Sequence, residues 1–193
     1  MKLRTVRVLA ICGTMVLLAC VPGTAGARSA TGRHCVFRLV PESRPKAHVI
    51  SARLERVGCF DTFSEAIEAG SGGSIKLALS IQPADLTNAM IADTTVSRVG
   101  DDTLIGTEWG ASGFGGISNN YMAPNSCVGT IYEVAYVGDA WNDKFESGKG
   151  FGGCDTNKKF VHSDFGGDVL TCTPNCSNYA SLANEVSSLK WKP

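Results

Sequence analysis

The side chains that could do chemistry in this chain are scattered, and they do not assemble into a catalytic set. Ser112 lies in the sequence Gly-Ala-Ser-Gly-Phe, but Phe114 stands where a nucleophile elbow requires its closing glycine. The histidines His34, His48 and His162 are too few to define a general-base scheme, and they show no metal-ligand spacing. We therefore predict that the protein is not an enzyme.

One pattern, an aromatic residue followed by four others and Phe-Gly-Gly, occurs twice, at residues 109–116 and 160–167. Each copy is followed by a polar turn that ends in serine, at Ser147 and at Ser188. A repeat of this kind indicates one supersecondary unit used twice. The glycines permit the backbone of a folded hairpin, and each serine can donate its hydroxyl to that hairpin. Greek-key units are tied in this way.

The first 27 residues have the parts of a secretion signal. Basic residues start the chain, residues 8–21 are almost wholly apolar, and small residues follow at 25–27. The apolar run is shorter than the roughly 20 residues of a membrane-spanning helix. The alternative is lipidation at Cys20, for which the second leucine of Leu-Leu-Ala-Cys is a poor fit. We expect a secreted mature chain without a membrane segment.

Net charge excludes several partners. The complete chain has 18 basic and 18 acidic side chains, and the mature chain is slightly acidic because its basic start leaves with the signal. There is no basic patch and no long run of like charge. We therefore expect no nucleic-acid partner and no membrane partner for the mature form. We also expect a monomer.

Cysteine usage indicates an oxidising compartment. Two of the eight cysteines, Cys12 and Cys20, lie in the signal, which leaves an even number in the mature chain. Such exported chains form disulfides, each worth roughly 2–4 kcal/mol. A zinc site is the alternative, but the chain has no Cys-x2-Cys pair. Six cysteines can pair in many ways. Pairing in chain order would give Cys35–Cys59, Cys127–Cys154 and Cys172–Cys176.

The sequence pattern of residues 28–99 predicts a small α+β region. A capping box, Thr62 with Glu65, starts a helix that Gly70 ends. Alternating and helical spacings of apolar residues mark the other elements. In chain order we expect strands at 35–40 and 48–57, a helix from 63, a strand at 74–80, a helix at 83–92 and a strand at 94–99.

Residues 100–193 differ from the preceding region in composition and in the spacing of apolar residues. Glycine density rises, and short β-prone runs alternate with turn residues, which is typical of an all-β sandwich. The first unit is longer than the second, and residues 119–132 look like an inserted loop. The β-prone runs are 103–109, 129–137, 159–162 and 189–191.

The hairpins and closing serines of residues 100–193 resemble those of the βγ-crystallin family. The chain also contains Cys-Phe-Asp-Thr-Phe at 59–63, Trp-Asn-Asp at 141–143 and Ser-Ser-x-x-Trp at 187–191. With these motifs the whole chain resembles small secreted actinobacterial proteins of uncharacterised role. The resemblance implies a mainly β fold, with two Greek-key units packed as a sandwich after the small α+β region. It covers about half of the mature chain.

The resemblance also implies a calcium site at each turn, with ligands from a backbone carbonyl at the third position and a hydroxyl at the fifth. These positions are Lys144 and Glu146 in the first turn, and Glu185 and Ser187 in the second. Glu146 departs from the hydroxyl pattern, and Ala183 replaces an Asn or Asp. Oxygen-rich turns suit Ca²⁺, which takes about six to eight oxygen ligands.

The alternative is that the turns are structural only, with Asn142 and Asn184 tolerating left-handed backbone. The residues of these structural turns are Asn142, Asp143, Ser147, Asn184 and Ser188.

Two other functions remain open because a fold does not decide function. The resemblance extends to secreted metallopeptidase inhibitors, so an extracellular peptidase is a candidate partner and residues 119–126 are the candidate inhibitory loop. The resemblance also extends to killer toxins. The leading hypothesis is a secreted, non-catalytic protein that binds calcium weakly.

Overall fold

The computed structural model describes residues 33–42, 47–92 and 102–193. The expected signal over residues 1–27, with Cys20, and the expected strand at 94–99 lie outside the described residues. In the part of the chain that is described, no helix is long and apolar enough to cross a membrane.

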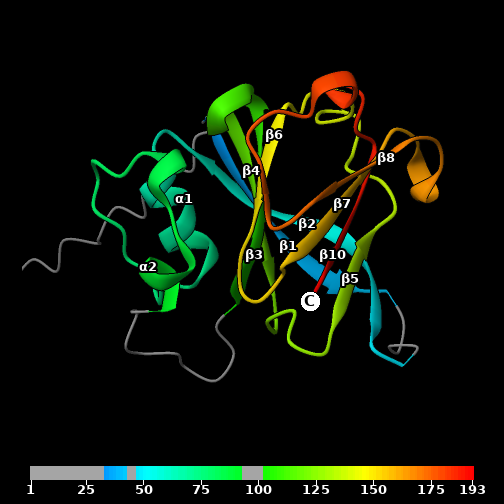
Figure 1. Cartoon of the computed structure of the whole chain (residues 1–193). Coiled ribbons are helices and arrows are strands. Elements are labelled where there is room, and N and C mark those ends of the chain that lie inside the picture. The colour runs from blue at the N-terminus through cyan, green and yellow to red at the C-terminus, as the bar shows by residue number, and fades with distance from the viewer. Residues whose placement is uncertain (1–32, 43–46, 93–101) are drawn as a thin grey trace, which may run out of the picture.

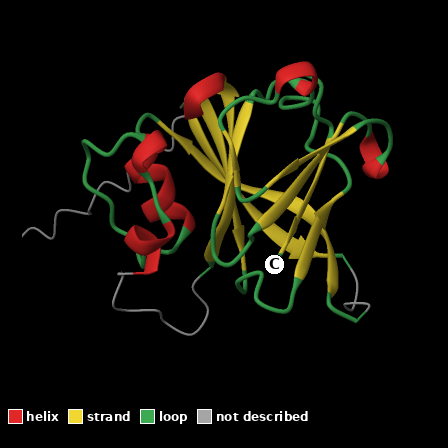
Figure 2. Ribbon diagram, in the orientation of Figure 1, coloured by secondary structure: helices red, strands yellow, loops and turns green. Residues whose placement is uncertain are grey.

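The second half of the chain contains the two units that the repeat predicts. Unit 1 consists of β3 (Thr103–Ala111), β4 (Gly115–Ala123), β5 (Ile131–Val134) and β6 (Ser147–Gly150). Unit 2 consists of β7 (Thr156–Phe160), β8 (Val169–Cys172), β9 (Asn175–Cys176) and β10 (Ser188–Lys192). The chain is mainly β, as predicted (Figure 2).

These strands form two antiparallel sheets that face each other (Figure 1). The first sheet has the order β4-β3-β6-β9 and the second has the order β8-β7-β10-β5. Each sheet therefore contains the first, second and fourth strands of one unit and the third strand of the other. This exchange confirms two Greek-key units packed as a sandwich.

The two units match residue by residue at their hairpins. Trp109 pairs with Ser147 in unit 1, and Phe160 pairs with Ser188 in unit 2. The Ser147 hydroxyl donates to the Ala111 carbonyl at 2.6 Å and accepts the Phe114 N–H at 3.1 Å.

The same bonds recur in unit 2. The Ser188 hydroxyl donates to the His162 carbonyl at 2.7 Å and accepts the Phe165 N–H at 3.1 Å. The two aromatic rings of each hairpin meet edge to face, with centroids 5.4 Å apart in unit 1 and 5.5 Å apart in unit 2. The repeat therefore encodes one geometry twice, and each serine ties a hairpin over its own sheet.

An N-terminal hairpin joins the two sheets. Strands β1 (His34–Pro41) and β2 (Val49–Phe60) pair with each other, and the Cys35–Cys59 disulfide links them. β1 runs parallel to β4, and β2 runs parallel to β5. The expected α+β region therefore shares its strands with both sheets, and these two strands lie between the edges of the sandwich.

The other disulfides also follow chain order. Cys127 is bonded to Cys154, and Cys172 is bonded to Cys176. The first of these links the β4–β5 connection to the segment before β7, and the second closes the turn between β8 and β9. The pairing of neighbours along the chain is confirmed.

Helix α1 (Phe63–Gly70) covers the outer face of the first sheet (Figure 1). The predicted capping box is present, with the Thr62 hydroxyl accepting the Glu65 N–H and the Glu65 carboxylate accepting the Thr62 N–H, both at 3.2 Å. The buried residues of α1 form a second core with Trp109 and Met122. A Cβ on Gly70 would lie 2.5 Å from Met122, so glycine lets the helix end against the sheet.

The strand expected at 74–80 is wrong. Ile75 is buried but Leu79 is 78% exposed, and the segment is irregular. The Ser64 hydroxyl donates to the Leu77 carbonyl at 3.0 Å, and the Ser71 hydroxyl accepts the Ile75 N–H at 3.0 Å. The segment lies under α1 and bonds to Ser64 in the helix and to Ser71 just after it, instead of to a strand. Its alternation therefore reflects packing against a helix.

The helix expected at 83–92 is broken into two pieces. A 3₁₀ turn covers Pro83–Asp85, and helix α2 covers Asn88–Ala92. Leu86, between them, is extended and almost fully buried. Burial of this side chain in the core under α1 outweighs the propensity to continue the helix.

The inserted loop expected at 119–132 is also partly wrong. Residues 119–123 belong to β4, which is central between β1 and β3, and Asn119 and Asn120 are fully buried. Asn120 accepts the Thr107 hydroxyl at 3.0 Å and donates to the Cys35 carbonyl at 2.9 Å. These bonds satisfy a polar side chain that resembles a loop residue in the sequence. The exposed connection between β4 and β5 begins at Pro124.

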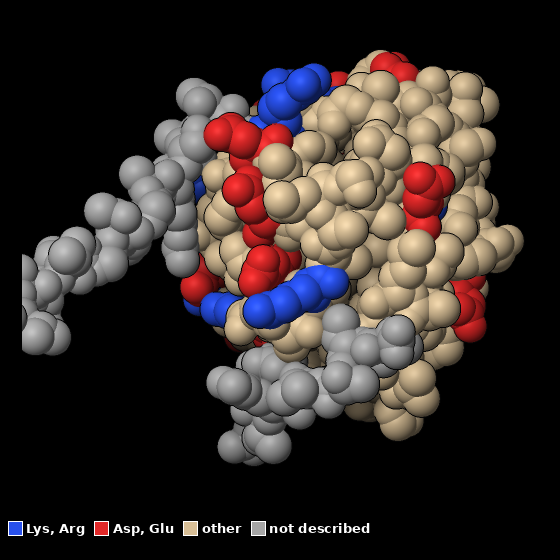
Figure 3. Space-filling view, turned by 90° about the vertical axis from the view of Figure 1, so that its left-hand side faces the viewer, with Lys and Arg blue, Asp and Glu red and all other residues tan. Residues whose placement is uncertain are grey.

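The face that carries the helices has mixed charge. Acidic side chains form a band on this face, with basic side chains at its two ends (Figure 3). It therefore offers no continuous basic surface of the kind that a phosphate backbone binds.

We predict that Ser147→Ala and Ser188→Ala each lower the free energy of unfolding by about 1–3 kcal/mol, since each leaves a hairpin carbonyl without its donor. Guanidinium denaturation measures the change. Ser112→Ala, an exposed position in the first hairpin, is the matched control. A loss no larger than that of the control would contradict the role of these serines.

Candidate functional site

The two serine-ended turns lie against each other at one end of the sandwich. The Asp143 N–H donates to the Val186 carbonyl at 3.2 Å, and the Asn184 N–H donates to the Phe145 carbonyl at 2.9 Å. Asp143 and Asn184 both have left-handed backbone, with φ of 59° and 60°. These reciprocal bonds relate the turns by an approximate twofold axis. The sequence pattern suggested Asn142 as the left-handed residue of the first turn. That suggestion is wrong, because the left-handed residue is Asp143.

The first corner contains Glu146. Its carboxylate accepts the Ser112 N–H at 3.1 Å and the Asn184 side-chain amide at 3.0 Å. Its own N–H donates to the Trp109 carbonyl at 2.8 Å. Glu146 therefore links the first hairpin to the second turn. Two N–H groups already point at the oxygens that a cation would need, so this corner does not fit Ca²⁺ well.

The second corner contains Ser187 at the equivalent position. Its hydroxyl donates to the Val161 carbonyl at 2.7 Å, and its N–H donates to the Phe160 carbonyl at 2.8 Å. The hydroxyl oxygen keeps its lone pairs. Lys144 and Glu185, whose carbonyls were the other expected ligands, are exposed in their turns. This corner fits a hard cation better than the first.

Acidic ligands are sparse at both corners. Among the described residues, no group of three or more His, Cys, Asp or Glu side chains could hold a metal ion. Any calcium would depend on carbonyl and hydroxyl oxygens with few charges, and such sites are weak.

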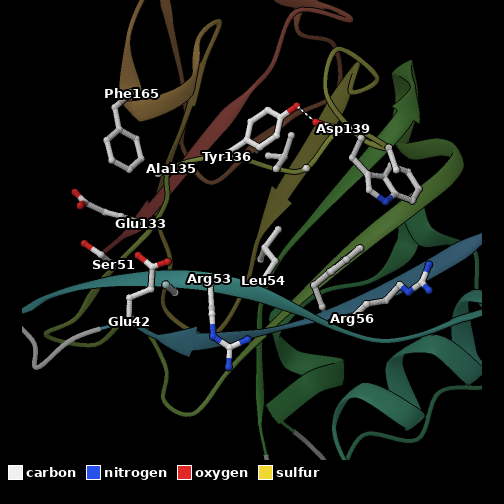
Figure 4. Close-up of a pocket in the computed structure, with 16 residues that line it drawn as sticks. Glu42, Ser51, Arg53, Leu54, Arg56, Glu133, Ala135, Tyr136, Asp139 and Phe165 are labelled. Atoms are coloured by element: carbon white, nitrogen blue, oxygen red, sulfur yellow. Dashed lines mark hydrogen bonds between the residues drawn. The ribbon is translucent and has the colours of Figure 1, made fainter.

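A pocket of about 470 Å³ lies between β2 and residues 135–141 (Figure 4). It opens where β2, after pairing with β5 over Val49–Ser51, continues alongside β1 alone. Leu54 points into the pocket from β2, opposite the ring of Tyr136 (Figure 4). The Tyr136 hydroxyl donates to the Asp139 carboxylate at 2.6 Å, which fixes the ring. No local pattern in the sequence predicts this pocket, because its walls are far apart in the chain.

A buried charge pair lies between the two sheets. The Lys159 ammonium contacts the Glu108 carboxylate, and both side chains are fully buried. The Tyr179 hydroxyl donates to the other oxygen of Glu108. Burial raises the pKa of Glu108 and lowers the pKa of Lys159. Sequence reasoning missed this cluster. A usable signal existed, since each residue directly precedes the first aromatic residue of its repeat.

Comparison with known proteins gives a limited result. No family model and no curated protein matches the chain. A solved βγ-crystallin from an archaeon is similar, with 22% identity, a TM-score of 0.35, and coverage of 46% of this chain and 98% of that one. The N-terminal domain of protein S is also similar, with 20% identity, a TM-score of 0.36, and coverage of 45% and 93%.

The fold is βγ-crystallin-like. The strand exchange and the duplicated hairpins of this chain carry that statement, and the similarities concern the fold alone. The two corners and the pocket are therefore interpreted from their own chemistry.

We predict that Glu146→Ala lowers the free energy of unfolding by about 1 kcal/mol, because it removes the acceptor of two hydrogen bonds between the units. Thermal melting in a calcium chelator measures the change without any metal contribution. Glu185→Ala, an exposed acid of the other turn, is the matched control. Equal melting of the Glu146→Ala variant and the wild type would show that the bridge is dispensable.

Proposed function

We propose that the protein is a secreted, non-catalytic, βγ-crystallin-like sandwich that binds Ca²⁺ weakly at its second corner. The observation that carries the proposal is the Ser187 hydroxyl, which donates to the Val161 carbonyl and keeps its lone pairs for a cation. Its turn is related to the first turn by the approximate twofold axis. Three disulfides support an oxidising, extracellular setting for the chain.

The ligand set follows from the twofold relation. Asn184 and Asp143 occupy equivalent places, and the Asn184 side chain reaches position 146 of the opposite turn. The Asp143 carboxylate accepts the Asn142 side-chain amide at 2.7 Å, and by the same relation it would turn toward Ser187 when an ion binds. Asp143, Ser187 and the Lys144 carbonyl would then supply oxygens to one ion. With a single carboxylate, we expect an affinity in the range of extracellular modules, with a dissociation constant of about 10⁻⁴–10⁻³ M.

We predict that Ca²⁺ stabilises the protein. At a concentration about tenfold above the dissociation constant, a bound ion adds roughly 1.4 kcal/mol to the free energy of unfolding. Asp143→Asn should remove this increment without disturbing the turn, because asparagine occupies the equivalent left-handed position at residue 184. Melting curves in Ca²⁺, in Mg²⁺ and in chelator measure the increment.

Glu146→Gln is the control for this experiment, since the first corner does not fit the ion. It should keep the full calcium increment. Identical melting of the wild type in Ca²⁺ and in chelator would end the calcium proposal. Loss of the increment in Glu146→Gln but not in Asp143→Asn would move the ion to the first corner.

A second candidate function, inhibition of an extracellular peptidase, is favoured by one observation. Val128 is 77% exposed at the tip of the β4–β5 connection, beside the disulfide-bonded Cys127. The Thr130 N–H donates to the Cys127 carbonyl at 2.9 Å, and the Cys127 N–H donates to the Gly152 carbonyl at 2.8 Å. An apolar side chain on a turn held in this way is preorganised for an apolar specificity pocket. The candidate loop is therefore 124–130, since residues 119–123 are buried in β4.

We predict that, if the protein is an inhibitor, it abolishes the activity of a thermolysin-type or serine peptidase at stoichiometric concentration. Val128→Asp should then weaken inhibition at least tenfold, because a charge enters an apolar pocket. Val169→Asp, at a half-exposed valine of unit 2, should leave inhibition unchanged. Full activity of a panel of such peptidases in excess protein would exclude this function.

A further inference from the structure

Glu108 and Lys159 hold the same position in the two units. Each directly precedes the first aromatic residue of its hairpin, Trp109 in β3 and Phe160 in β7. The twofold relation therefore brings the two side chains together between the sheets, where both are fully buried. Their contact links unit 1 directly to unit 2.

The surroundings of this pair exclude water and leave it few polar neighbours. The Lys159 nitrogen lies 5.7 Å from the centre of the Trp191 ring and 5.8 Å from that of Tyr179. The Tyr179 hydroxyl donates to the oxygen of Glu108 that Lys159 does not contact. A Cβ on Gly148 would lie 2.1 Å from that hydroxyl, so glycine at this position leaves room for the tyrosine.

An ion pair in such a site is costly. Removing two charges from water costs several kcal/mol per ion, and few further hydrogen bonds offset that cost here. Burial raises the pKa of Glu108 and lowers the pKa of Lys159, so moving the proton from the ammonium to the carboxylate costs less here than in water. The neutral amine is a nucleophile, and the neutral acid is an electrophile.

We propose that Lys159 and Glu108 condense to form an amide bond that covalently joins the two units. The proton of the ammonium passes to the carboxylate, and the amine nitrogen then attacks the Glu108 carboxyl carbon. The oxygen held by the Tyr179 hydroxyl carries the negative charge of the tetrahedral intermediate, in the manner of an oxyanion hole. The other oxygen leaves as water with a second proton from the nitrogen. No oxidant or cofactor is required.

Position and burial hold the reacting groups together, which replaces a bimolecular encounter by an intramolecular step. The product is neutral, so the cost of burying two charges disappears. The bond would tie β3 to β7, and it would survive the reducing conditions that open the three disulfides.

The test is the mass of the mature wild-type protein after reduction and alkylation. We expect a mass lower than that of the sequence by one water molecule. Tryptic digestion should yield one peptide that joins the Glu108 segment to the Lys159 segment, with no cleavage after Lys159. An unmodified mass would overturn the proposal, and so would a water loss that maps elsewhere.

Asn119 is an alternative acyl partner for Lys159, and the mass measurement distinguishes it from Glu108. It is the cross-strand partner of Glu108, and its side-chain oxygen is buried without a hydrogen-bond partner. A loss of one ammonia molecule, with Lys159 joined to Asn119, would overturn the assignment of Glu108 as acyl partner. Fragment spectra of the joined peptide distinguish the two linkages.

Tyr179→Phe tests the role of the hydroxyl while keeping the buried ring. We expect the variant to fold and to form the bond at least tenfold more slowly, seen as unmodified protein that converts with time after refolding. Formation at the wild-type rate would overturn the role assigned to Tyr179. Since the wild-type mass is itself decisive, the proposal does not depend on the folding of any variant.

Discussion

The structure depends on the exchange of third strands between the two units. β5 of unit 1 completes the second sheet, and β9 of unit 2 completes the first. Neither unit can therefore form its sheet, or bury its apolar face, without the other. The corner geometry follows from this constraint, because the chain must leave each exchanged strand through a turn that lies against the opposite unit. The reciprocal bonds of Asp143 and Asn184 are the local expression of that arrangement.

The exchange also brings polar side chains from equivalent positions of the two units close to the approximate twofold axis. Positions that are equivalent in the two hairpins meet between the sheets, so a repeat that carried two identical polar residues would bring like groups together. Here the residues are Glu108 and Lys159, which attract each other. At the corners the same relation places Glu146 in one copy and Ser187 in the other. Because the two copies differ here, the first corner is a hydrogen-bonded bridge between the units of one chain. The second corner keeps a hydroxyl oxygen that can bind a cation.

The N-terminal hairpin covers one edge of each sheet of the sandwich. An isolated pair of sheets would expose β4 and β5 as edges, and exposed edges invite pairing with other chains. β1 and β2 occupy both edges and join the sheets into one continuous order. β2 pairs with β5 only over Val49–Ser51, so the two strands separate beyond Ser51 and leave an opening between them. The pocket near Tyr136 and Leu54 is a consequence of that incomplete closure.

Several cysteine pairings stayed open in the sequence, and the structure selected the chain-order one. Local patterns in the sequence determined the repeat, the capping box at Thr62 and the serine ties. Each depends on groups that lie within one unit or close in the chain, so spacing alone predicts it. The strand expected at 74–80 failed because packing against a helix produces the same alternation as a sheet. Asn119 and Asn120 resembled a loop because the partners of Asn120 lie on other strands. Only the tertiary structure decided the strand exchange, the pocket and the meeting of Glu108 with Lys159, since contacts between distant segments depend on how the two units pack.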